Sequence, residues 1–133
     1  MEYKYDSPVN AIISLEKAYT EKDLKGIINS KDFKTEAKII LIQADYNYNI
    51  NDSLLIDETA TLLETSLIKT LNDNGFPSFN NVKREFSELE LSDFDDNIYL
   101  IQEKLIFPDN VLYTNKIFLT NINSAWKIAM IEE

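Results

Sequence analysis

The sequence predicts an α+β fold in which N-terminal helices pack on a bent antiparallel sheet of about four strands. Apolar residues recur at helical spacing over residues 7–74, and then alternate with a period of two over residues 80–132. Short turns separate the alternating runs, which is typical of consecutive antiparallel strands. A chain of 133 residues can bury one core, so we expect a single domain spanning residues 1–133.

The first helix is predicted to begin at Pro8. Ser7 can cap this helix, and proline suits its first position because the missing N–H would have no partner there. The apolar positions that follow at helical spacing are Val9, Ile12, Ile13, Leu15 and Tyr19. A short second helix, weakened by Gly26, is predicted over residues 20–30.

Two further helical segments are predicted before the sheet. In residues 31–46, Asp32 is a cap for apolar positions at helical spacing: Phe33, Ala37, Ile40, Leu41 and Ala44. The isoleucine-rich segment 38–43 also fits a strand, so residues 32–45 stay open between helix and strand. The longest helix is predicted from Ser53 to Leu71, and Gly75 suits the left-handed residue that follows a helix.

The four strands are predicted within residues 81–91, 97–107, 111–121 and 124–131. In the first, Val82 and Phe86 share one parity, whereas Leu89 and Leu91 take the other. Such a change of parity indicates a bulge or a bend.

The last strand contains the single tryptophan of the chain. Trp126, Ile128 and Met130 share a parity, and their side chains are bulkier than those of the alternate positions. We expect this face to point at the helices, with Trp126 largely buried as a core anchor.

Motifs at both ends of the chain resemble one superfamily. An A-Y-x-x-K-D-L pattern is matched by Ala18, Tyr19, Lys22, Asp23 and Leu24, and a closing Trp-Lys-Ile by Trp126, Lys127 and Ile128. These patterns resemble the nuclear transport factor 2-like superfamily. The resemblance implies a cone in which a bent sheet wraps the helices and leaves a pocket at its wide end. The helical character of residues 32–45 departs from the many relatives that have a short strand there.

The segment NGFPSFNNV, residues 74–82, resembles the small bacterial members of that superfamily that act as immunity proteins of toxin systems. This likeness implies a protein that neutralises a toxin by binding it.

Composition narrows the function classes. A net charge of −10 disfavours nucleic acids and anionic membranes and favours a basic protein partner, although acidity also serves solubility alone. No apolar run approaches the ~20 residues of a membrane span, and the N-terminus lacks the pattern of a secretory signal. With no cysteine in the chain, we expect a cytoplasmic protein without disulfides.

Catalytic and metal-binding motifs do not emerge from the sequence. Without histidine, a His–Asp pair is impossible, and the remaining acid–base candidates are Asp45, Tyr46, Glu103 and Tyr113. Residues 93–97 begin like a calcium loop, but Ile98 replaces the required glycine and Lys104 the bidentate glutamate. We therefore expect no catalytic residues, no metal and no cofactor.

An acidic stretch in residues 86–96 is the candidate partner-binding surface. Its residues are Glu88, Glu90, Asp93, Asp95 and Asp96, with Phe94 as an apolar anchor among them. The alternative is a solvated face of the sheet that runs into a charged turn.

Three functions remain open. The first is a non-enzymatic binding protein that blocks a basic protein partner, such as a toxin domain. The second is a pocket enzyme or small-ligand binder of the ketosteroid-isomerase or polyketide-cyclase kind, which the resemblance implies. The third is a homodimer whose sheet packs on a second copy.

Overall fold

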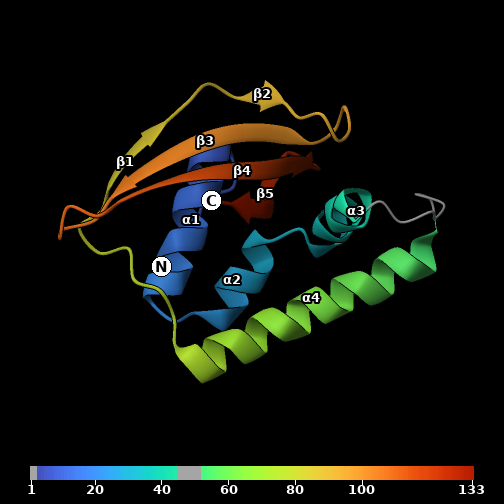
Figure 1. Ribbon diagram of the computed structural model, residues 1–133, viewed down its shortest axis with the longest axis horizontal. Helices are drawn as coiled ribbons and strands as arrows, with labels where there is room; N and C mark the ends of the chain where they lie inside the picture. Colours follow the sequence, from blue (N-terminus) through green and yellow to red (C-terminus); the bar gives the residue numbers. More distant parts are fainter. Residues whose placement is uncertain (1–2, 45–51) are drawn as a thin grey trace.

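The computed structural model describes residues 3–44 and 52–133. Four helices precede five strands: α1 (Pro8–Thr20), α2 (Leu24–Ser30), α3 (Phe33–Gln43), α4 (Ser53–Asn74), β1 (Lys83–Phe86), β2 (Glu90–Leu91), β3 (Tyr99–Ile106), β4 (Leu112–Ile122) and β5 (Ala125–Glu132). In Figure 1 the sheet forms the upper layer, α4 runs along the lower edge, and α2 lies between them. The predicted α+β arrangement is confirmed.

The helix ends follow the predicted caps. Ser7 Oγ accepts a hydrogen bond from the Asn10 N–H at 3.1 Å, with proline in the first turn of α1. Asp32 Oδ1 accepts from the Thr35 N–H at 3.0 Å and starts α3, so residues 33–43 form a helix and not a strand. Gly75 ends α4 with a φ of 88°, which is the left-handed region that favours glycine.

The sheet is antiparallel, with strand order β1-β3-β4-β5, and β2 also pairs with β3. Phe86 pairs with Glu103 and Glu90 with Leu100, so the register shifts by one residue between β1 and β2. Ser87 fills the interruption, because its Oγ accepts a hydrogen bond from the Gln102 N–H at 2.8 Å. The predicted bend is thus confirmed, and it adds the short fifth strand.

Helices cover both faces of the sheet. The inner face, defined by Ile101, Ile117 and Leu119, packs with α1 and α2 in the main core cluster. The outer face packs with Ile39 of α3 in a second cluster, which also contains Ile98, Phe118, Ala129 and Met130. A third cluster joins α3 to α4 through Ala37, Leu41, Ile56 and Ala60. The chain crosses from one face to the other where Lys31 forms a parallel bridge with Ile128 at the edge of the sheet.

A bulge in β5 changes the predicted face of its last residues. Leu119 pairs with Ile128, but Phe118 pairs with Met130, so Ala129 is an extra residue. Ile128 therefore belongs to the inner cluster and Met130 to the outer one. The prediction that Met130 shares a face with Trp126 and Ile128 is wrong.

Trp126 is half-buried, rather than largely buried as predicted. Its ring packs against the inner cluster and meets Tyr99 edge-on, with 5.2 Å between the ring centroids. Its backbone N–H donates to the carbonyl of Tyr5 at 2.8 Å. Trp126 therefore helps fasten the N-terminal segment to the last strand.

The buried helix faces also differ in part from the apolar pattern. In α1, Ile13 is exposed, whereas Ser14 and Glu16 are buried. In α3, Ile39 is fully buried because the helix lies between the sheet and α4, while Ala44 is exposed. In α4, Leu54 is exposed. Within residues 3–44 and 52–133, no helix combines the length and the apolar character that crossing a membrane requires.

Candidate functional site

An aromatic cavity of about 620 Å³ opens at the end of the inner face where β3 turns into β4. The strands place Leu105, Tyr113 and Asn115 on it, because Leu105 pairs with Tyr113 and Glu103 with Asn115 on the same side of the sheet. The residues that line it are Phe79, Leu105, Phe107, Pro108, Asp109, Val111, Tyr113, Asn115 and Glu133. Its size is within the usual range for small-molecule sites.

A row of aromatic rings leads from α1 to the aromatic cavity, and three of them, Phe79, Phe107 and Tyr113, form one of its walls. The centroids of Tyr19 and Phe79 lie 6.3 Å apart, those of Phe79 and Phe107 6.1 Å, and those of Phe107 and Tyr113 5.4 Å. The Phe79 N–H donates to Thr20 Oγ1 at 2.8 Å, which fixes the segment before β1 against α1. The wall therefore comes from three parts of the chain that the fold holds together.

Glu103 lies buried beneath this cavity. It takes the inward position between Ile101 and Leu105 on β3, and only 1% of its surface is exposed. Asn115, which lines the cavity, donates from Nδ2 to Glu103 Oε1 at 3.4 Å. No donor group of the described residues reaches Glu103 Oε2. A buried carboxyl oxygen without a donor is costly unless it carries a proton of its own to donate.

Two charged side chains complete the polar cluster. Glu16 of α1 is buried beside Glu103, and Arg84 of β1 contacts the Oε1 of Glu16 through Nε at 2.6 Å. Burial, followed by the hydrogen bond and charge of Glu16, raises the pKa of Glu103 to about 9, while Asn115 and Arg84 act in the opposite direction. Glu103 therefore keeps its proton at neutral pH and can donate it in a hydrogen bond to Glu16.

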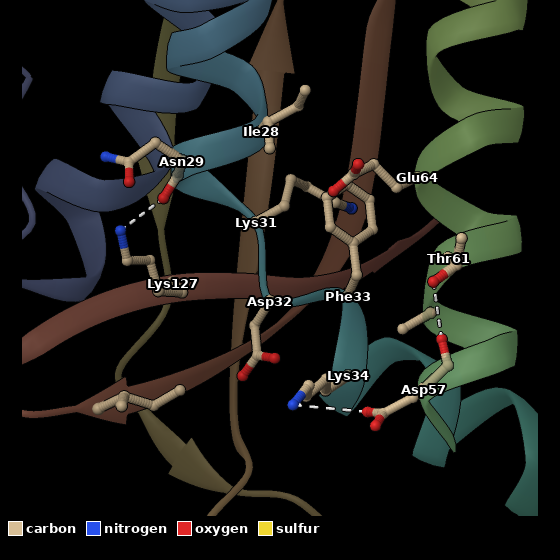
Figure 2. Close-up of a pocket in the computed structure, with 12 residues that line it drawn as sticks. Ile28, Asn29, Lys31, Asp32, Phe33, Lys34, Asp57, Thr61, Glu64 and Lys127 are labelled. Atoms are coloured by element: carbon tan, nitrogen blue, oxygen red, sulfur yellow. Dashed lines mark hydrogen bonds and ion pairs between the residues drawn. The ribbon is translucent and has the colours of Figure 1, made fainter. Parts of the chain in front are cut away.

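A second cavity of about 690 Å³ lies between the α2–α3 junction, α4 and the β4–β5 turn (Figure 2). Its lysines already have partners. Lys34 pairs with Asp57 at 3.4 Å, and Lys127 donates to the Asn29 carbonyl, as the dashed lines show. Lys31 pairs with Glu36 at 3.4 Å.

Asp32, which also lines this second cavity, is equally engaged. Its Oδ2 accepts from Thr35 Oγ1 and from Thr120 Oγ1, both at 2.7 Å. The Lys127 pKa is lowered by burial, with Asp32 acting in the opposite direction. These polar groups join α2, α3, α4 and the sheet, so the second cavity is a weaker ligand site than the aromatic cavity.

The predicted acidic surface lies at the opposite end of β3 from the aromatic cavity, because β2 pairs with Tyr99 and Leu100. Its acidic side chains are all exposed: Glu88, Glu90, Asp93, Asp95 and Asp96. Phe94 is half-buried, and its ring meets Phe118 of the outer cluster edge-on at 5.2 Å. Phe94 therefore supports the fold, and partner binding by the acidic side chains stays a prediction.

Of the predicted acid–base candidates, the structure brings Glu103 and Tyr113 to one site, while Asp45 and Tyr46 lie outside the described residues. The sequence pattern did not indicate Glu16, Arg84 or Asn115. A signal for Glu16 was present, because it lies four residues after Ile12 and therefore on the same side of α1.

Comparison with protein-family models and with curated proteins finds no match for this sequence. Two solved structures are similar in fold. An NTF2-like transpeptidase from Campylobacter jejuni superposes with a TM-score of 0.51 at 13% identity, covering 93% of this chain and 99% of that one. A phospholipid-binding protein from Ralstonia solanacearum, solved with a phospholipid, has a TM-score of 0.50 at 13% identity, covering 93% and 74%. The predicted nuclear transport factor 2-like fold is thus confirmed.

Proposed function

We propose that this protein binds a small, mainly apolar molecule in the aromatic cavity and does not catalyse a reaction on it. The observation that carries the proposal is the cavity itself, with a volume of about 620 Å³, aromatic and aliphatic walls and few polar groups. Small-molecule sites combine an apolar lining with a few polar groups that orient the ligand. Asn115 supplies such a group at the floor.

The buried cluster beneath the floor agrees with this use. A protonated Glu103 adds no charge under the apolar walls, so an apolar body can enter without desolvating a carboxylate. That a protein of similar fold from Ralstonia solanacearum is solved with a phospholipid supports a ligand in this kind of scaffold.

The proposal is tested by comparing ligand binding to the parent protein with binding to a variant whose cavity is filled. Native mass spectrometry of the purified protein identifies any molecule that stays bound, and ligand-observed NMR measures its affinity. Val111→Trp adds a large ring at an exposed rim position and should abolish binding. Leu91→Trp places the same ring at an exposed position near the other end of β3 and should leave binding unchanged. Equal binding by both variants would refute the aromatic cavity as the site.

A second candidate function is binding of a basic protein, and the exposed acidic surface favours it. In that case the protein neutralises a partner such as a toxin domain, as the bacterial immunity proteins that its sequence resembles do. Exposed Leu89 and Leu91, at 38% and 58%, add apolar contacts beside Glu88 and Glu90.

The second candidate predicts salt-dependent association. Replacing Asp93, Asp95 and Asp96 with Asn should slow association with a purified basic partner in surface plasmon resonance, and lower salt should speed association of the parent protein. The fold should persist, because all three side chains are exposed. Association rates that respond to neither change would exclude this surface.

A further inference from the structure

The charged residues that line the aromatic cavity are all acidic. Asp109 and Glu133 line its rim, and none of the described residues that line it is basic. Asp109 is held in place, because its Oδ1 accepts a hydrogen bond from the Val111 N–H at 3.1 Å. Its carboxylate therefore stands at the cavity entrance in a fixed position. A rim with two carboxylates attracts cations and repels anions.

The aromatic walls of the cavity also favour a cation. Phe79, Phe107 and Tyr113 supply three aromatic rings, whose faces carry partial negative charge and attract an organic cation. The large apolar area of these rings also favours the hydrocarbon body of such a ligand. A fully hydrated inorganic ion would gain nothing from that area.

The floor adds a hydrogen-bond acceptor and, among the described residues, no positive charge. Because Asn115 Nδ2 donates to Glu103, its carbonyl Oδ1 is left as an acceptor that has no partner among the residues described. Arg84, the nearby cation, contacts Glu16 and lines a different hollow of the surface, which shares Phe79 with the aromatic cavity.

We propose that the ligand of the aromatic cavity is an organic cation, an alkyl- or arylammonium ion whose apolar body contacts the rings while its ammonium group faces the acidic rim. This inference rests on the proposed binding of a small molecule and names the chemical class of that molecule. It predicts that charge, at constant apolar size, decides affinity.

Three probes with one skeleton test the inference: 4-phenylbutylamine, 4-phenylbutan-1-ol and 4-phenylbutanoate, measured by ligand-observed NMR and isothermal titration calorimetry at pH 7. The amine should bind about tenfold more tightly than the alcohol, and the carboxylate more weakly than the alcohol. Asp109→Asn, which preserves the turn, and Tyr113→Leu, which removes one ring, should each reduce the amine-to-alcohol ratio. Asp93→Asn removes the same charge far from the cavity and should leave the ratio unchanged.

The outcomes separate this inference from the proposed function. If amine and alcohol bind equally and Val111→Trp blocks both, the cavity binds small molecules without selecting cations, and only the inference is wrong. If no probe and no co-purified molecule binds, the proposed function itself fails. An amine preference that Asp93→Asn reduces as much as Asp109→Asn would assign the preference to net charge and overturn the proposed site.

Discussion

Replacing Glu103 with Gln should stabilise the protein at neutral pH. The pKa of Glu103 is raised to about 9 in the folded protein, from an ordinary value of 4.5. Between these values the folded protein keeps a proton that the unfolded chain releases, so the free energy of unfolding falls as pH rises. The contribution is fully present below pH 4.5 and is lost progressively up to about pH 9.

The size of this effect follows from the difference in the number of protons that the folded and unfolded states bind. One group that binds a proton only in the folded state lowers the free energy of unfolding by ~1.4 kcal/mol per pH unit. From pH 5 to pH 7 the limit is therefore ~3 kcal/mol. The glutamine introduced by Glu103→Gln has the shape of the protonated acid: its side-chain oxygen can accept from Asn115, and its amide can donate to Glu16 as the acid proton does.

Urea unfolding followed by circular dichroism at pH 5, 6, 7 and 8 gives both stability curves. The Glu103→Gln variant should gain stability over the parent protein as pH rises, while the two should be similar at pH 5. Glu88→Gln, at an exposed position, is the matched control and should follow the parent curve. Parallel curves for Glu103→Gln and parent would show that Glu103 ionises normally in the folded state and would refute the reasoning.

Three further predictions concern contacts that hold the site and the fold, each measured by urea unfolding. Arg84→Ala leaves the buried Glu16 carboxylate without its cation and should cost ~3–5 kcal/mol; a loss below ~1 kcal/mol would mean that water replaces the guanidinium. Asp32→Ala removes the cap of α3 and the bond from Thr120, and should cost ~2–4 kcal/mol, with Asp32→Asn less damaging. Trp126→Ala should cost ~2–3 kcal/mol, less than a fully buried tryptophan, and an unchanged midpoint would contradict its packing on Tyr99.

Local chemistry made much of the fold predictable from the sequence. Ser7, Asp32 and Gly75 mark helix ends because their side chains or backbone preferences act within a few residues. The bend between β1 and β2 was equally visible, since an extra residue must invert the alternation of apolar side chains. These features depend on neighbours in sequence and need no knowledge of tertiary packing.

The bulge in β5 was not predictable by the same means. Ile128, Ala129 and Met130 are all apolar, and both faces of the sheet at this point are covered by helices. Alternation carries no information when both faces are buried. The position of α3 has the same cause: a helix between two apolar layers buries residues on two sides, so a single stripe could not identify Ile39.

The candidate site was only partly predictable, because it joins residues far apart in the sequence. Glu103 alternates with the apolar residues Ile101 and Leu105, so the sequence indicated that its side chain points inward. The partners of Glu103 come from α1, β1 and β4, and the sequence did not indicate them. The aromatic wall likewise joins the segment before β1, the β3–β4 turn and β4. These contacts form between residues that are far apart in the chain. A single sequence does not show which of its distant residues come together.

The buried cluster of Glu16, Arg84 and Glu103 is not what stability alone would favour. Buried ion pairs often contribute less to stability than apolar residues of the same size, and a buried Glu103 with a raised pKa lowers the free energy of unfolding as pH rises. The inward neighbours of Glu103 along β3, Ile101 and Leu105, are both buried and apolar. Sites that bind or react are where such costs concentrate. The position of the cluster, joined through Asn115 to the floor of the aromatic cavity, is therefore the strongest reason to look for a ligand there.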